Sequence, residues 1–370
     1  MSKTEVDDAT ISRVLMYIQR FGDLNPRILG ALAHNKNMDS VIKLIKEEFS
    51  LNVSYIARYK SIGLKALFFL LVNADPRIEL VDIYEIFDGY PVFVERDQTR
   101  NEKLIIGLTI PPKFENDIVN IINELEQRGV FDIIDFLNIE DSIQFTYDFS
   151  TYDFKLRRYK EQFLVEPREP VYFPDLSDGF EPDWIDLQII GKKQERNFLS
   201  LKDIAKMIGE NYRTVLRHYQ EHIIGKGLIS VFGIRLNGEN QTRISIIFDE
   251  NEDFLRELTR IPTLTHVHRL SKNKYYGIAF LEDSIASGIL EYISQLKYKY
   301  HVDADVMIHP FEPRLKYLLA ASIPYEHFTV DGRWTMDKQR IRDSIERVVR
   351  KLKAPGSTQS YHIPRLGKIE

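Results

Sequence analysis

The stretch SLKDIAKMIGENYRTVLRHYQEHIIGKGLI, residues 200–229, decides the fold that we expect for this chain. Ser200 and Asn211 are residue types that cap helix N-termini, and each precedes a run of apolar residues with helical spacing. Gly209 and Gly227 can adopt the left-handed conformation that ends a helix. The stretch therefore predicts two short helices joined by a tight turn. This is the geometry of a helix-turn-helix, whose second helix lies in the major groove of DNA.

The sequence on both sides of this stretch completes a longer pattern. A helix is expected from Asp183, and strands are expected at 228–236 and 243–249, on either side of the turn signal Asn237-Gly238. A helix, two strands, a helix and a strand follow, up to residue 309. The predicted order is three helices and a wing, then β-α-β-β-α-β.

The first half of the chain repeats this order of elements without repeating its residues. We therefore predict an α+β fold with two winged helix-turn-helix domains and two ferredoxin-like β-α-β-β-α-β domains in tandem. The winged helices are expected at 8–60 and 183–236, the ferredoxin-like domains at 61–150 and 237–330, a proline-rich linker at 151–182, and a basic C-terminal helix and tail at 331–370.

Composition narrows the class of protein. The hydrophobic fraction of 44% and the charged fraction of 28% are those of a soluble globular chain. The chain has no cysteine, which excludes disulfides, thiolate catalysis and cysteine-ligated zinc or iron–sulfur sites. No apolar run approaches the ~20 residues of a membrane-spanning helix, and no apolar segment follows the N-terminus as in a secretory signal. We expect a cytoplasmic protein without a membrane partner.

Charge is distributed unevenly along the chain. Residues 333–370 contain ten basic and four acidic residues, whereas the whole chain has a net charge of −5. A basic tail on an acidic body has two interpretations. The tail adds contacts to DNA phosphates, or it forms a helix that packs against the acidic surface of the same protein.

Side chains near the start of the helix after Asn211 are candidate contacts to DNA. Arginine can donate two hydrogen bonds to guanine, asparagine can bind adenine, and tyrosine or threonine can reach phosphates or a thymine methyl. The candidates in this copy are Ser200, Asn211, Tyr212, Arg213, Thr214, Arg217 and His218. The first copy offers Lys43, Lys46, Arg58 and Lys60, but acidic neighbours weaken its attraction to phosphates. The expected partner is double-stranded DNA.

Several of these segments resemble one family. The run WIDLQII at 184–190, followed by the stretch at 200–229, resembles the N-terminal domain of the Lrp/AsnC or "feast/famine" regulators of archaea and bacteria. Residues 55–72 and 260–280 resemble parts of that family's ferredoxin-like RAM domain. The resemblance implies a transcription regulator that is not an enzyme, carries no cofactor and pairs with itself through its RAM domains.

Two departures from the family pattern change this expectation. The family usually has one copy of the unit per chain, so two copies imply a built-in pseudo-dimer that reads an asymmetric DNA target. The family's Gly-x-Tyr-Asp motif has no counterpart in NKYYGIAF or NEKLIIGL. Amino-acid sensing is therefore not expected, and any effector is unknown.

The histidines of the second half support an alternative. His266 and His268 lie two apart on an expected strand and so share a face, but two ligands do not make a metal site, and none is predicted. Sirohaem decarboxylases resemble the same regulator family, occur as paired or fused units and use histidines near the RAM pocket. A duplicated chain with these two histidines keeps such an enzyme as an alternative, although neither half of the sequence has that family's aromatic and histidine signature. A third possibility is a protein-interaction scaffold, since three-helix units also dock proteins.

Overall fold

The computed structural model describes residues 6–22, 26–32, 34, 37–171, 175–196, 198–236, 242–310 and 316–354. The chain divides into two compact units. The first unit consists of Met1–Ile56, Ile139–Phe173 and Ile229–Phe311, and the second of Ala57–Asn138, Pro174–Leu228 and Glu312–Glu370. The turn signal at residues 237 and 238 and the tail beyond residue 354 lie outside the described residues.

Three helices open the first unit: α1 (Asp8–Phe21), α2 (Pro26–Leu32) and α3 (Met38–Phe49). Helix α1 begins where the Asp7 carboxylate accepts a hydrogen bond from the backbone N–H of Thr10 at 2.7 Å. Its buried residues Val14, Leu15 and Ile18 follow the spacing of one helix face. Strand β1 (Asn52–Ala57) follows the helices and pairs with β8 (Ile229–Arg235), a strand from the other half of the sequence.

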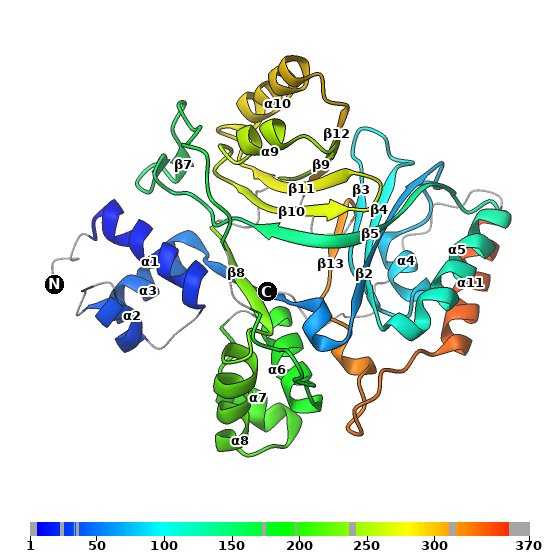
Figure 1. Cartoon of the computed structure of the whole chain (residues 1–370), viewed down its shortest axis with the longest axis horizontal. Coiled ribbons are helices and arrows are strands. Elements are labelled where there is room, and N and C mark those ends of the chain that lie inside the picture. Colours follow the sequence, from blue (N-terminus) through cyan, green and yellow to red (C-terminus); the bar gives the residue numbers. More distant parts are fainter. Residues whose placement is uncertain are drawn as a thin grey trace. The chain divides into compact units, whose positions relative to one another are not determined.

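The main sheet of the first unit is antiparallel. Its strands run in the order β12 (Ala304–Pro310), β9 (Thr242–Asp249), β11 (Lys274–Leu281), β10 (Leu264–Leu270) and the last residues of β5 (Asp132–Gln144). Helices α9 (Glu252–Leu258) and α10 (Ala286–Tyr300) lie along one side of these strands (Figure 1). Phe248 of β9 contacts Phe254 of α9, which joins sheet and helix layers.

The sheet of the second unit is also antiparallel. Along the sequence, its strands and helices follow the same β-α-β-β-α-β order as those of the first unit. The first part of β5 pairs with β2 (Lys65–Val72), which pairs with β4 (Leu104–Ile110), then β3 (Pro91–Arg96) and β13 (Leu318–Ala320). One apolar core joins this sheet to α4 (Leu80–Ile86), α5 (Glu115–Gln127) and α11 (Lys338–Lys353). The prediction of a mixed α/β protein with antiparallel sheets is confirmed.

A second set of three helices belongs to the second unit: α6 (Trp184–Glu195), α7 (Leu201–Ile208) and α8 (Tyr212–Arg217). The predicted signals act as expected: Ser200 caps α7, Gly209 has φ +73°, and Asn211 caps α8. The last helix differs from the prediction because α8 ends at Arg217 and continues as a π-helical segment, η3 (His218–Ile224).

The remaining short elements are η1 (Tyr59–Ile62), η2 (Pro112–Phe114), η5 (Tyr325–His327), β6 (Tyr152–Asp153) and β7 (Arg158–Tyr159).

The basic C-terminal helix packs against its own unit. In α11, Ile341, Ile345, Val348 and Val349 are buried in the core of the second unit. Arg347 forms an ion pair with Glu85, and the ammonium of Lys351 lies 2.9 Å from the carboxylate of Asp82. The structure supports the second interpretation of the basic helix, because Arg347 and Lys351 pair with carboxylates of α4 and the apolar face of the helix is part of the core.

The described part of the chain has no helix that is long and apolar enough to cross a membrane. The cytoplasmic location stays a prediction.

Candidate functional site

Strand alternation gathers polar side chains on one face of the first unit's sheet. Residues that pair directly across neighbouring strands share a face. The register pairs His268 with both Tyr276 and Ser142, and pairs His266 with both Ile278 and Gln144. Phe248 contacts α9, so the odd-numbered residues of β9 lie on the opposite face. We call this group the polar sheet face; its members are Ser142, Gln144, Arg243, Ser245, His266, His268 and Tyr276.

Hydrogen bonds and ring contacts connect these side chains. The Nδ1 atom of His268 lies 2.7 Å from the hydroxyl of Ser142, and the His268 ring is parallel to that of Tyr276 with centroids 5.8 Å apart. Arg243 donates a hydrogen bond of 3.1 Å from Nη2 to the hydroxyl of Tyr276. The hydroxyl of Ser245 lies 3.1 Å from the same oxygen. The connections run across four neighbouring strands, β5, β10, β11 and β9.

The electrostatic environment keeps His266 neutral. Burial lowers the pKa of His266 to about 3, and the neighbouring His268 and Arg243 lower it further. A neutral imidazole at pH 7 can accept a proton or a hydrogen bond. A bound anion would raise the pKa of His266 again, since it offsets the neighbouring positive charge.

A second guanidinium lies close to this face. Burial lowers the pKa of Arg235, at the end of β8, and Arg243 lowers it further, whereas Tyr147 opposes the shift. The Arg235 guanidinium lies 5.7 Å from the ring centroid of Phe280, which pairs with Arg243 in the sheet. A carboxylate placed near these two guanidiniums would be stabilised by their charge.

The corresponding face of the second unit carries different chemistry. Its core includes Leu67, Phe69 and Leu71, so the opposite face of β2 presents Phe68 and Leu70. Their partners on β4 and β5 include Gly107, Ile105 and Leu137. Among the described residues, the pair of adjacent histidines is therefore confined to the face of the first unit.

Sequence reasoning found part of this site. His266 and His268 were singled out, and the prediction that they share a face is confirmed, since their rings stack with centroids 6.0 Å apart. Sequence analysis did not identify Arg243, Ser245 and Tyr276 as site residues. The run RISIIFD carries the signal for two of them, because Arg243 and Ser245 alternate with isoleucines and so share the face away from the core.

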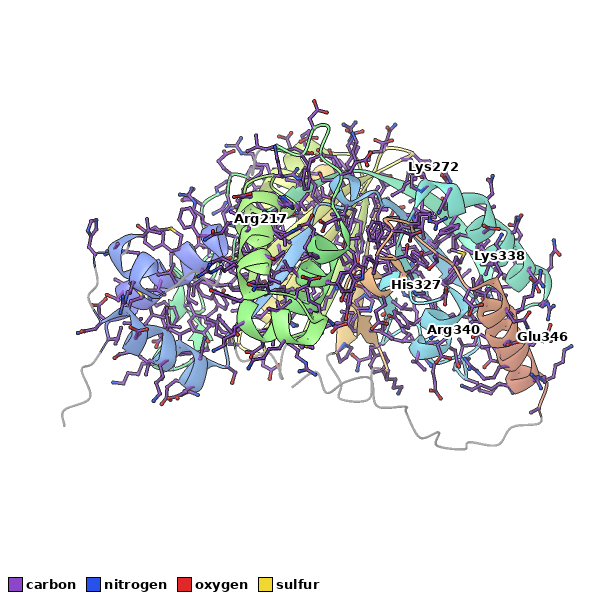
Figure 2. All side chains as sticks on the ribbon, turned by 90° about the horizontal axis from the view of Figure 1, so that it is seen from below. Arg217, Lys272, His327, Lys338, Arg340 and Glu346 are labelled. Carbon is purple, nitrogen blue, oxygen red and sulfur yellow. The ribbon has the colours of Figure 1, made fainter. Side chains whose placement is uncertain are left out.

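The residues predicted to contact DNA in the second copy differ in their surroundings: two of them cap helices, several are exposed, and one is buried. Ser200 and Asn211 use their side chains as helix caps, accepting hydrogen bonds from the N–H groups of Asp203 and Arg213. Tyr212, Arg213 and Arg217 are exposed (Figure 2 labels Arg217 on α8), and Thr214 is half-buried. His218 was expected near the exposed side of this helix, and that was wrong.

His218 is buried because its ring turns inward to a carboxylate of α6. Only 4% of the residue is exposed, and its Nδ1 lies 3.0 Å from Oδ1 of Asp186. It cannot contact a ligand at the helix surface.

In the first copy, the predicted contacts are partly engaged within their own unit. Lys43 forms an ion pair of 3.8 Å with Glu47, and Lys46 and Lys60 are exposed. Arg58 donates a hydrogen bond from Nε to the carbonyl of Gly227 at 3.1 Å. This contact lies within the second unit.

Comparisons with known proteins found similar solved structures. No family model and no curated protein matches the chain. One similar structure is the crystal structure of the siroheme decarboxylase NirDL, with 12% sequence identity and a TM-score of 0.46. Another is the same enzyme in co-complex with an iron-uroporphyrin III analogue, with 12% identity and a TM-score of 0.47. Each match covers 93% of this chain and 100% of the other.

These findings contradict the expected regulator. Both structures belong to an enzyme, so the predicted Lrp/AsnC transcription regulator, its DNA partner and the expectation that the chain is not an enzyme are corrected. At 12% identity and TM-scores below 0.5, neither structure assigns an activity to this chain. We therefore argue its function from its own residues.

Proposed function

We propose that the chain is an enzyme that binds a polycarboxylate tetrapyrrole at the polar sheet face and removes carboxyl groups from it as carbon dioxide. The observation that carries the proposal is the row of His266 and His268 beside Arg243 and Tyr276 on one desolvated face. The substrate class is that printed for the two similar structures, a siroheme decarboxylase and its complex with an iron-uroporphyrin III analogue.

Charge supports a polycarboxylate ligand. Arg243 and Arg235 are desolvated cations, and a carboxylate is the partner that a guanidinium binds with two parallel hydrogen bonds. Tyr276 is held between Arg243 and Ser245, so its hydroxyl is fixed in position for a ligand oxygen.

The histidines supply the proton that the reaction needs. When a carboxylate leaves as carbon dioxide, the electron pair of the broken carbon–carbon bond stays on the remaining carbon, which then takes up one proton. His266 is neutral in the free protein because burial, His268 and Arg243 lower its pKa. Carboxylates of the bound substrate raise that pKa, so His266 takes a proton from water and donates it as a general acid.

We also propose the architecture that presents this face. The strand order β12-β9-β11-β10 and the order of elements support a ferredoxin-like domain at 237–330, and β5-β2-β4-β3 supports its counterpart at 61–150. The two sets of three helices, each followed by a strand, support winged helix-turn-helix domains at 8–60 and 183–236, used here as structural parts. Residues 151–182 would be the linker and 331–370 the C-terminal helix and tail.

The test combines binding and product analysis. The full chain is incubated with sirohaem and with iron-uroporphyrin III, and the loss of carbon dioxide is followed by mass spectrometry of the tetrapyrrole. We expect His266→Gln and His268→Gln each to lower the rate by about 10²–10⁴-fold, while binding, followed by the tetrapyrrole's visible absorption, is retained. Arg269→Gln, on the exposed opposite face of the same strand, is the matched control and should keep full activity. The absence of tetrapyrrole binding, or equal rates in both histidine variants and the wild type, overturns the proposal.

A further inference from the structure

Two carboxylates and two imidazoles meet in the second unit, at the start of α6 and on η3. Asp183 is the N-cap of α6 and Asp186 its third residue, and each carboxylate accepts a hydrogen bond of 3.1 Å from the other's backbone N–H. His218 and His222 lie four residues apart on η3, with ring centroids 4.4 Å apart. We call these four residues the Asp-His cluster.

The ligand atoms of the cluster lie close enough together to surround one metal ion. The Nδ1 atoms of His218 and His222 lie 3.0 and 3.1 Å from the same oxygen of Asp186. Nδ1 of His218 is 3.5 Å from Oδ1 of Asp183, and one ligand atom from each of the four residues lies within 4.8 Å of all the others. Four ligands at the ~2.0–2.2 Å bond lengths of tetrahedral zinc are about 3.3–3.6 Å apart. The observed separations therefore bracket those of a filled site.

Burial and charge also favour a cation. The side chains of Asp186 and His218 are 0% and 5% exposed, whereas His222 is 25% and Asp183 53% exposed. Asp186 is a buried carboxylate beside the carboxylate of Asp183, and two neighbouring negative charges repel each other. A divalent cation would neutralise both carboxylates. The ring of Phe180 packs on His222 with centroids 4.9 Å apart and covers part of the cluster.

We propose that the Asp-His cluster binds one divalent transition-metal ion of the zinc class, which links α6 to η3. Imidazole nitrogens and carboxylate oxygens without a thiolate form a set suited to zinc and its neighbours. Four protein ligands leave no open position, so the ion is structural. The half-exposed Asp183 is the ligand through which the ion enters.

The local structure is consistent with a ligand set. The spacing Asp-x-x-Asp at 183–186 places both carboxylates in the first turn of α6, and His-x-x-x-His at 218–222 places both rings on one side of η3. A single π-helical segment within a helix is frequently found at functional sites. The site uses none of the residues of the proposed tetrapyrrole site, so the two proposals stand or fall separately.

The test measures metal on the full chain. Zinc content of the purified protein is determined by mass spectrometry, and Co²⁺ is titrated into chelator-treated protein while the visible absorption of four-coordinate cobalt is followed. The variants are His222→Gln and Asp183→Asn, which alter the two more exposed ligands. Glu221→Gln and Asp203→Asn are the control variants, because both residues are exposed carboxylates outside the cluster, Glu221 on η3 and Asp203 on α7.

We expect one ion per wild-type chain and per control chain, four-coordinate cobalt absorption that Zn²⁺ abolishes, and an unfolding temperature that rises when Zn²⁺ is added. Each ligand variant should bind at least tenfold more weakly and lose the rise in unfolding temperature. No saturable binding, absorption typical of six-coordinate hydrated cobalt, or wild-type affinity in either ligand variant overturns the proposal.

Discussion

His266 and His268 extend from the same face of β10, and their rings lie within 24° of parallel with centroids 6.0 Å apart. Protonation of one ring therefore disfavours protonation of the other. Arg243, two strands away in the sheet, also lowers the pKa of His266, and burial lowers it more than either neighbour does. The result is a histidine whose pKa is about 3 in the folded protein.

The first prediction concerns stability at mildly acidic pH. In the unfolded chain His266 titrates near pH 6.5, so the unfolded state binds more protons than the folded state as the pH falls from 6.5 toward 3. The free energy of unfolding should fall over this window by up to about 1.4 kcal/mol per pH unit from this group. Urea unfolding of the wild type and of His266→Gln at a series of pH values measures how the free energy of unfolding depends on pH. The two curves should diverge in slope below about pH 6.5, and parallel curves would contradict the assigned pKa.

A second prediction concerns Arg168 in the first unit. Its guanidinium donates hydrogen bonds to the carbonyls of Thr146, Thr259, Ile261 and Leu264. Lysine has one point charge and cannot reach these acceptors at once, so Arg168→Lys should lower the free energy of unfolding by about 3 kcal/mol. The exposed Arg157, paired with Glu48, is the control. Arg157→Lys should cost no more than about 1 kcal/mol in the same denaturant titration, and equal losses would count against the assigned role.

The third prediction concerns close packing at Gly191 in α6. A Cβ atom added there would lie 1.9 Å from Cδ1 of Tyr325, whose buried ring is held by a 2.7 Å hydrogen bond from its hydroxyl to Glu195. The ring cannot withdraw freely, so Gly191→Ala should destabilise the protein by about 1–3 kcal/mol. At Gly233 the nearest atom, Cβ of Ser54, would be 3.7 Å away. Gly233→Ala should therefore leave the thermal midpoint nearly unchanged, and a similar shift in both variants would refute the packing argument.

The fourth prediction separates a core helix from a basic arm. Ile345 of α11 is 2% exposed and belongs to the core of the second unit. Ile345→Ala should lower the free energy of unfolding by about 2–5 kcal/mol, because it leaves a cavity. Arg342→Ala, at an exposed position of the same helix, should change it by about 0.5 kcal/mol or less. Figure 2 shows Lys338, Arg340 and Glu346 along this helix. If Ile345→Ala were neutral, the helix would not be part of the core.

Local signals in the sequence were sufficient for most of the helices and strands. Caps and turn glycines act within one helical turn, so Ser200, Gly209 and Asn211 could be assigned from their neighbours alone. Alternation along the strand at 264–270 likewise placed His266 and His268 on one face. The resemblance to a regulator family rested on the same local signals, which do not show which side chains form a binding or catalytic site. This is why the predicted function was wrong.

What the sequence by itself determined is thus the identity and order of the elements, because helix and strand periodicity and capping depend on contacts between near neighbours. The tertiary structure decided which side chains meet. Strand register brought Arg243 of β9 to Tyr276 of β11 and Ser142 of β5 to His268 of β10. Helix packing turned His218 away from the surface toward Asp186, 32 residues earlier in the chain. Such contacts depend on long-range pairing and burial, which no local pattern specifies.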